Sequence, residues 1–313
     1  DFLFARFSYY FTKAQTTEVV SRPEKKYLGM DPMLTLKDST GTEVNYYQVN
    51  VFDDELYGKS MRAIDKAISL YPEMLDYRFL KANAYIAYEK ESPDMALPYL
   101  LDLAGREKER KWTYEESPVP EGLFEEFMQE YCYSFYSIGS PAAYDAFLTL
   151  SQKLASVYPD YLDFRFIKAN AYIAYEKESP DMTLAYLKNL ISENTSRKTS
   201  WDFDGTKADE NFFEDAMQEY CFTFYTIGSQ SSYEAFLNLS QLLSKLYPDN
   251  MGFINNIGSY YLLKHEYKTA LKYYNKVLKK HPGDRTAMQN ALIAAKKMKN
   301  TKLEKKYLKL MGK

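Results

Sequence analysis

The sequence predicts an all-α protein, an α-α superhelix of stacked helical hairpins, with a short non-repeating N-terminal segment that contains a β-hairpin. Two observations lead to this fold class. The stretch KANAYIAYEKESPDM occurs identically at 81–95 and at 168–182. The 313 residues include only 12 Gly and 12 Pro, too few for an all-β protein with many tight turns. A long internal repeat favours helical units, each of which buries its apolar face against the next.

The duplication extends well beyond the fifteen identical residues. Residues 121–160 and 210–249 share 24 identities in 40, and Trp112 aligns with Trp201. A third, more divergent copy at 253–278 aligns with 164–191 once two residues are omitted. The sequence therefore divides into a double-hairpin unit of 87–89 residues, present twice, a single hairpin and capping helices, at about 61–149, 150–238, 250–284 and 285–313.

Apolar spacing inside each unit is helical. In 164–175 the apolar residues recur at steps of three and four, at Phe164, Ile167, Ala171 and Ala174. The Ser-Pro pairs at 92–93 and 179–180 predict an N-cap serine followed by a proline at the first helical position. The Tyr-Pro pairs that begin at Tyr71, Tyr158 and Tyr247 predict helix ends, because proline disfavours helix in the residue before it.

Residues 1–56 do not repeat, and we expect them to pack on the first hairpin as a separate segment. The stretch 1–14 is predicted as the first helix of a hairpin whose second helix is 54–71. Between them, 34–49 contains two alternating runs around a Ser-Thr-Gly turn, which predicts a β-hairpin.

The third copy, NNIGSYYLLKHEYKTALKYYNKVLKKHPGD at 255–284, resembles a tetratricopeptide repeat (TPR). It has the family's small, aromatic and proline positions at Gly258, Tyr261, Ala270, Tyr274 and Pro282. The spacing lets Gly258 and Ala270 bring two helices close together while the tyrosines fill the groove beside them. The resemblance is clearest at 253–284 and extends, with degenerate repeats, over 57–313.

The upstream repeats depart from the family pattern in three ways. The ANAY runs at 82–85 and 169–172 have alanine where the family has glycine, and their turns are two residues longer. Arg78, Lys81, Arg165 and Lys168 stand at positions that are usually apolar. In the intervening hairpins, cysteine occupies the small position and glycine ends the first helix, at Cys132, Gly139, Cys221 and Gly228.

The resemblance implies a concave face, lined by the first helix of each hairpin, that binds protein or an extended peptide. The positions it points to are Phe79, Asn83, Gln129, Tyr133, Tyr136, Phe166, Asn170, Gln218, Phe222, Tyr225, Asn255 and Ser259. Amide side chains can pair with peptide backbone in either sense, and tyrosine adds flat apolar area. The alternative is that Asn83 and Asn170 bond to the backbone of the adjacent repeat. Phenylalanine replaces the lysine that some family members use to clamp a terminal carboxylate, so we do not expect that mode of binding.

Two further features have more than one interpretation. Trp112 and Trp201, the only tryptophans, lie in long connections at matching places and either bind a partner or plug the ends of their hairpins. From Lys264 to Lys313 there are 15 Lys and Arg against 3 Asp and Glu, whereas the preceding residues carry 25 against 40. The basic end is a solvated cap, a face for an anionic partner or a contact with the acidic body of a second copy. That acidic body favours a basic peptide as the ligand.

The sequence gives little indication of an enzymatic activity. It contains two histidines, His265 and His281, and two cysteines at packing positions, and it has no recognised catalytic, nucleotide or metal motif. No cofactor or metal is therefore predicted. An overall pI of about 5.7 argues against nucleic-acid binding, and no apolar run approaches the eighteen residues of a membrane span.

The leading hypothesis is a non-enzymatic adaptor or scaffold that binds protein or peptide. The alternative is an exported structural or glycan-binding protein that uses its exposed Tyr and Trp surfaces. An enzyme whose site is completed by residues 1–56 is the least favoured. A first residue other than Met, 31 tyrosines and no disulfide framework favour an exported bacterial protein slightly over a cytosolic one.

Overall fold

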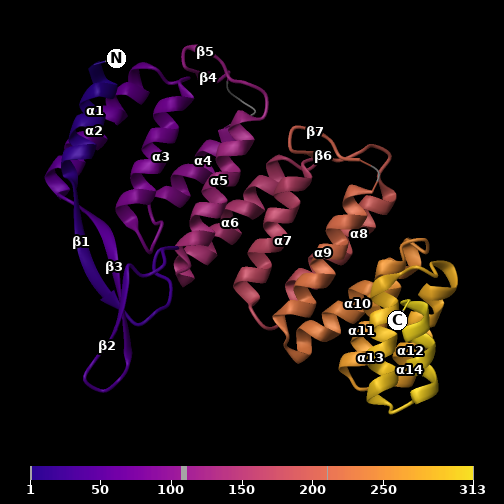
Figure 1. Ribbon diagram of the computed structural model, residues 1–313. Coiled ribbons are helices and arrows are strands. Elements are labelled where there is room, and N and C mark those ends of the chain that lie inside the picture. The colour runs from indigo at the N-terminus through magenta and orange to yellow at the C-terminus, as the bar shows by residue number, and fades with distance from the viewer. Residues whose placement is uncertain (1, 107–110, 210, 313) are drawn as a thin grey trace. The chain divides into compact units, whose positions relative to one another are not determined.

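The computed structural model describes residues 2–106, 111–209 and 211–312. Its helices are α1 (Phe2–Ala14), α2 (Asp54–Leu70), α3 (Leu75–Glu89), α4 (Ala96–Arg106), α5 (Leu123–Ile138), α6 (Pro141–Val157), α7 (Leu162–Glu176), α8 (Asp181–Ser196), α9 (Phe212–Ile227), α10 (Gln230–Leu246), α11 (Met251–Leu263), α12 (Tyr267–Lys280), α13 (Arg285–Lys297) and α14 (Thr301–Leu310) (Figure 1). Helices dominate the described chain, and the predicted all-α class is confirmed.

The strands form three small sheets. They are β1 (Gln15–Arg22), β2 (Leu34–Lys37), β3 (Glu43–Phe52), β4 (Thr113–Tyr114), β5 (Ser117–Pro118), β6 (Asp202–Phe203) and β7 (Thr206–Lys207). The predicted N-terminal hairpin is confirmed, because β2 pairs antiparallel with β3, with Lys37 opposite Glu43. β1 was not predicted. It pairs along β3 from Gln15 opposite Phe52, so the sheet order is β1-β3-β2.

The chain folds as two compact units. Unit 1 comprises residues 1–175 and 201–206, and unit 2 comprises 176–200 and 207–313. The sequence division at 61–149 and 150–238 describes the duplication and stays a prediction for domain boundaries.

Within each unit, many helices that follow one another in the chain pack together. In unit 1, α1 packs on α2, α2 on α3, α3 on α4 and α5 on α6, and α4 also reaches α6. In unit 2, α9 packs on α10, and α10 through α14 pack each on the next, while α11 also contacts both α9 and α13. Contact with the next helix and the next but one is the packing of stacked hairpins.

The predicted helix ends are confirmed. Tyr71, Tyr158 and Tyr247 are the C-caps of α2, α6 and α10. Gly139 and Gly228 end α5 and α9 with φ of 75° and 78°, a left-handed conformation that glycine adopts without strain.

The prediction that Ser92 and Ser179 cap the next helices is wrong. α4 and α8 begin later, and the cap is the carboxylate of a glutamate in the preceding helix. Glu89 accepts the N–H groups of Met95 and Ala96, the latter at 2.9 Å, and Glu176 does the same for Met182 and Thr183. A carboxylate at a helix N-terminus also interacts favourably with the helix dipole.

The close approach predicted at Gly258 is present. A Cβ atom on Gly258 would lie 2.6 Å from the ring of Tyr274, so only glycine lets α11 and α12 meet there. The tyrosine ring is fully buried and its hydroxyl donates to Ser259 Oγ at 3.3 Å. This packing explains why the third copy keeps the small and aromatic positions of the repeat.

Candidate functional site

The candidate site is an open cavity of about 480 Å³ in unit 1, which we call the α3 pocket. It lies between α1, α3, the β4–β5 turn and α5, whose labels can be followed in Figure 1. Its lining residues are Phe4, Met74, Asp76, Tyr77, Phe79, Leu80, Asn83, Tyr114, Glu115 and Phe127. Two of the sequence-predicted binding residues, Phe79 and Asn83, belong to it.

Backbone pairing places the β4–β5 turn beside the start of α3. The N–H of Thr113 donates to the carbonyl of Glu73 at 2.8 Å. Two residues later, the N–H of Glu115 donates to the Asp76 carboxylate at 3.0 Å. These bonds bring Tyr114 and Glu115 to the pocket although Glu115 is 39 residues from Asp76 in sequence, which is why the repeat pattern could not reveal them.

Aromatic rings form the wall of the pocket. Phe79 stacks on Phe127 with ring centroids 4.1 Å apart, and the Tyr114 ring lies 6.3 Å from Phe127. Phe79 is only 3% exposed, so it supports the wall rather than standing free in solvent. Phe4, from the non-repeating segment, is 44% exposed and contributes apolar surface.

The polar groups of the pocket are one amide and two carboxylates. Asn83 is exposed and makes no hydrogen bond within the described residues. The Asp76 carboxylate keeps acceptor capacity beyond the one N–H that it binds, because a carboxylate has about four lone-pair sites. Glu115 is exposed at the turn. No Lys or Arg is among the described residues that line the pocket.

The other predicted residues of unit 1 lie on α5 and α7. Tyr133 and Tyr136 are 45% and 49% exposed on α5, and Gln129 is half-buried on the same helix. Asn170 hydrogen-bonds the side chain of Tyr133, whose pKa is raised by burial and lowered by this bond. Phe166 packs edge-on against Phe203 at 6.5 Å.

Unit 2 holds the remaining predicted residues on α9 and α11. Phe222 and Tyr225 are exposed on α9, while Gln218 exchanges side-chain hydrogen bonds with Asn256. Asn255 is 7% exposed and donates to the Asp284 carboxylate at the start of α13, and Ser259 accepts the Tyr274 hydroxyl. Asn255 and Ser259 thus join neighbouring helices, whereas Phe222 and Tyr225 present aromatic surface to solvent.

Both tryptophans are buried, at 8% for Trp112 and 3% for Trp201. The Arg78 guanidinium lies 4.9 Å from the Trp112 ring, and Arg165 lies 6.0 Å from Trp201. These contacts explain why arginine replaces an apolar residue at this position of the repeat. The burial corresponds to the interpretation in which each indole closes the end of its hairpin.

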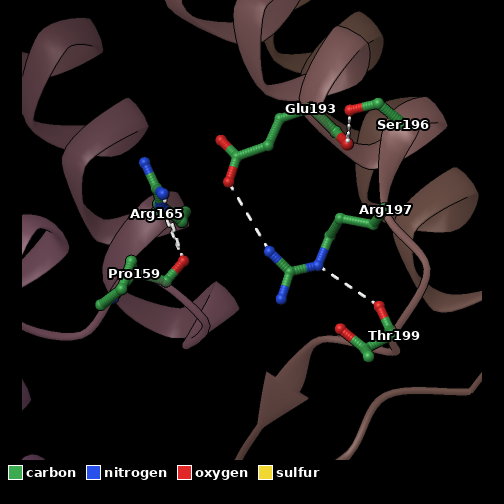
Figure 2. Close-up of polar contacts among 6 residues, drawn as sticks. All are labelled: Pro159, Arg165, Glu193, Ser196, Arg197 and Thr199. Carbon is green, nitrogen blue, oxygen red and sulfur yellow. Dashed lines mark hydrogen bonds and ion pairs between the residues drawn. The ribbon is translucent and has the colours of Figure 1, made fainter.

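Each of these arginines also bonds a carbonyl of the preceding turn. Arg165 donates to the Pro159 carbonyl at 3.1 Å (Figure 2), and Arg78 donates to the Pro72 carbonyl at 2.7 Å. In unit 2, contacts of Arg197 hold the segment that precedes Trp201 in the chain. There Arg197 donates to the Thr199 carbonyl at 3.3 Å and pairs with the Glu193 carboxylate at 3.6 Å (Figure 2).

Within the described part of the chain, the thiols and the possible metal ligands can be assessed directly. Cys132 and Cys221 are buried, and burial raises the pKa of both thiols, that of Cys221 to about 12. Neither is therefore a thiolate near neutral pH. Among residues 2–106, 111–209 and 211–312, no group of three or more His, Cys, Asp or Glu is placed to hold a metal ion. No helix of these residues is long and apolar enough to cross a membrane.

A second cavity, of about 530 Å³, was not predicted. It lies between the N-terminal sheet and the end of α3, and its lining includes Met30, Met33, Gln48, Asn50 and Lys90. It depends on β1, which has no counterpart in the repeat, so periodicity carried no signal for it.

The basic end of the chain forms α12 to α14 of unit 2. Lys268, Lys272 and Lys276 are exposed along α12 at steps of four. Lys306 of α14 donates to the Asn275 side chain of α12 at 3.3 Å, which joins these two basic helices. Self-association through this region stays a prediction.

Comparisons with known proteins do not identify a family for this chain. No family model matches the sequence, and the curated proteins that were searched give no match. Among solved structures, the chain is similar to the TPR2AB-domain:pHSP90 complex of yeast Sti1. The identity is 14%, the alignment covers 82% of this chain and 83% of that one, and the TM-score is 0.29. The fold is assigned from the packing of the helices described above.

Proposed function

We propose that this protein is a non-enzymatic binding module for protein or extended peptide, acting as an adaptor or scaffold through the concave face of a TPR-like solenoid. The observation that carries the proposal is the α3 pocket. It combines an aromatic wall with an exposed amide, Asn83, that has no partner in the described chain. Such an amide can donate to and accept from a peptide backbone, while aromatic walls bury apolar side chains. The carboxylates of the pocket favour a basic ligand.

The test is a selection from a random octapeptide library with the full chain, followed by affinity measurement on variants. Asn83→Ala removes the amide, and Phe4→Ala removes apolar area from a side chain that is already 44% exposed. Each is expected to weaken selected peptides about fivefold or more, the effect of losing one hydrogen bond or one apolar contact.

The matched control is Thr149→Ala on α6. Its side chain is exposed and bonds only within its own helix, to the Asp145 carbonyl at 2.8 Å. It is expected to leave affinity unchanged. Equal affinities for wild type, Asn83→Ala and Phe4→Ala would contradict binding at the α3 pocket. A library that returns no binder would contradict the proposed function itself.

The exposed tyrosines of α5 support glycan binding as the second candidate. Sugar rings stack on exposed, coplanar aromatic faces, and Tyr133 and Tyr136 are both accessible. However, the Tyr136 ring is inclined by 56° to Tyr144 and packs against Phe147, so it does not form a flat platform with its neighbour. A glycan array that gives specific binding, abolished by Tyr133→Ala, would favour this candidate over the first.

A further inference from the structure

We propose that the α3 pocket binds the side chain of an arginine from an extended partner polypeptide. This inference rests on the proposed function and specifies the chemistry of its ligand. The pocket is the place where aromatic faces, carboxylates and an unbonded amide converge in unit 1.

The charge of the pocket selects a cation. Asp76 and Glu115 are the charged residues in its described lining, and both are carboxylates. A guanidinium has five N–H donors in a rigid fork, which suits two carboxylates and the Asn83 amide oxygen together. Hydrogen bonds between a guanidinium and a carboxylate are about twice as strong as those between neutral groups.

The aromatic wall suits the planar head and the aliphatic stem of arginine. Phe127 and Tyr114 line the pocket together with Asp76 and Glu115, and Leu80 adds apolar surface. The same molecule already holds guanidinium groups over aromatic rings, since Arg78 lies 4.9 Å from Trp112 and Arg22 lies 4.9 Å from Tyr27. Lysine, a compact and strongly hydrated point charge, gains less from such a wall.

The second copy of the repeat retains the scaffold but lacks this chemistry. Asp163 accepts the N–H of Asp204 at 3.1 Å, just as Asp76 accepts that of Glu115. Other groups differ. The residue aligned with Phe127 is Ala216, and Asn170 is bonded to Tyr133, whereas Asn83 is unbonded in the described chain. The chain therefore contains its own matched control for the α3 pocket.

The turn beside the pocket also carries more negative charge in the first copy than in the second. Glu115 and Glu116 occupy it with φ of 48° and 61°, where the second copy has Asp204 and Gly205. A left-handed conformation is costly for residues other than glycine, asparagine and aspartate. The first copy thus places two carboxylates at this turn in a conformation that the second copy adopts at lower cost.

The experiment titrates the full chain with Ac-Ala-Ala-Arg-Ala-Ala-NH2 and with the same peptide carrying citrulline, which has the shape of arginine without its charge. NMR of the ¹⁵N-labelled asparagine side-chain amides reads Asn83 directly. At low salt we expect the arginine peptide to shift the Asn83 signals and to bind about tenfold more tightly than the citrulline peptide, the value of one charge-assisted hydrogen bond. The corresponding lysine peptide is expected to lie between them.

Glu115→Gln keeps the backbone N–H that anchors the turn and removes one carboxylate, so it should reduce the preference for arginine to about threefold or less. The control Asp204→Asn, at the matching place in the second copy, should leave the preference unchanged. Equal binding of the arginine and citrulline peptides, no shift of Asn83, or an equal loss in Asp204→Asn would overturn the inference. The octapeptide selection decides separately whether the protein binds peptides, so failure of the proposed function can be distinguished from failure of the arginine preference alone.

Discussion

Helices α3 and α7 have almost the same sequence, and yet the pKa values of their aligned lysines shift in opposite directions. Lys81 and Lys168 occupy the same position of the fifteen-residue identity. Burial lowers the pKa of both, but for Lys81 the hydrogen bonds to Asp65 and Tyr85 more than reverse the effect, and its pKa is raised. The pKa of Lys168 is lowered by burial and by the nearby charge of Arg165.

The difference originates outside the identical stretch. Lys81 Nζ lies 2.7 Å from the Asp65 carboxylate. The residue aligned with Asp65 is Gln152, which instead donates to the Tyr172 hydroxyl at 3.5 Å. A repeated helix therefore keeps its packing residues, while the carboxylate that pairs with Lys81 comes from the neighbouring helix α2.

The identical stretch itself has a structural role in both copies. Glu89 and Glu176 cap the following helix, and the carbonyls of Glu91 and Glu178 accept the hydroxyls of Ser140 and Ser229. The cap requires a glutamate side chain at 89 and 176, whereas the contacts with Ser140 and Ser229 use backbone carbonyls and depend only on the same chain path. The pocket residues contributed from outside the stretch are free to differ, and they do.

The largest expected effect is a loss of stability when either tryptophan is removed, and it tests whether the two indoles stabilise their copies equally. Trp112→Ala and Trp201→Ala should each lower the free energy of unfolding by about 3 kcal/mol or more, because each removes a buried indole and leaves a cavity. Circular dichroism in urea measures the loss, and the remaining tryptophan reports fluorescence from the other copy. A loss near zero at either position would show that its indole does not close a hairpin.

The next largest effect is a change of stability at the turn beside the α3 pocket, where the two copies differ in backbone strain. Glu116→Gly should raise the free energy of unfolding by about 1 kcal/mol, because it relieves a left-handed conformation at φ 61°. The reverse change, Gly205→Glu at φ 68°, should lower it by a similar amount. Urea titration of both variants measures this pair. If Glu116→Gly is neutral, the strain attributed to the first copy is absent.

Substitutions at Asp65 and Gln152, the residues aligned beside the two lysines, should alter stability less than those at the tryptophans and the turn. Asp65→Asn is expected to lower the free energy of unfolding by about 0.5–1 kcal/mol, since the carboxylate is half exposed and screened by water. Gln152→Asp places a carboxylate at the aligned position of the second copy and should raise the free energy of unfolding by a smaller amount. A double variant whose stability returns to that of wild type would support equivalent sites, whereas no change in either single variant would contradict the role of Asp65.

The smallest effect is a titration. NMR of the lysine side chains should show Lys168 losing its proton below pH 10.5, the ordinary value, and Lys81 above it. In stability terms, the contribution of Lys81 is present below pH 10.5 and is lost as the pH rises through its raised pKa. For Lys168 the unfolded chain binds more protons between its lowered pKa and 10.5, so stability rises with pH across that window. Asp65→Asn should move the pKa of Lys81 toward that of Lys168, and an unchanged titration would contradict the assignment.

The sequence by itself determined the helical class, the duplication, the helix ends at Tyr71, Tyr158 and Tyr247, and the packing role of Gly258. Each of these follows from local periodicity or from the backbone preferences of proline and glycine, which act within a few residues. Only the tertiary structure decided which of the repeated polar residues stand free. Asn83 is unbonded within the described chain, Asn170 is bonded to Tyr133, and Tyr114 and Glu115 join the α3 pocket through backbone pairing with a segment some forty residues away. Such contacts join residues that are far apart in sequence, and no periodic pattern within one helix encodes them.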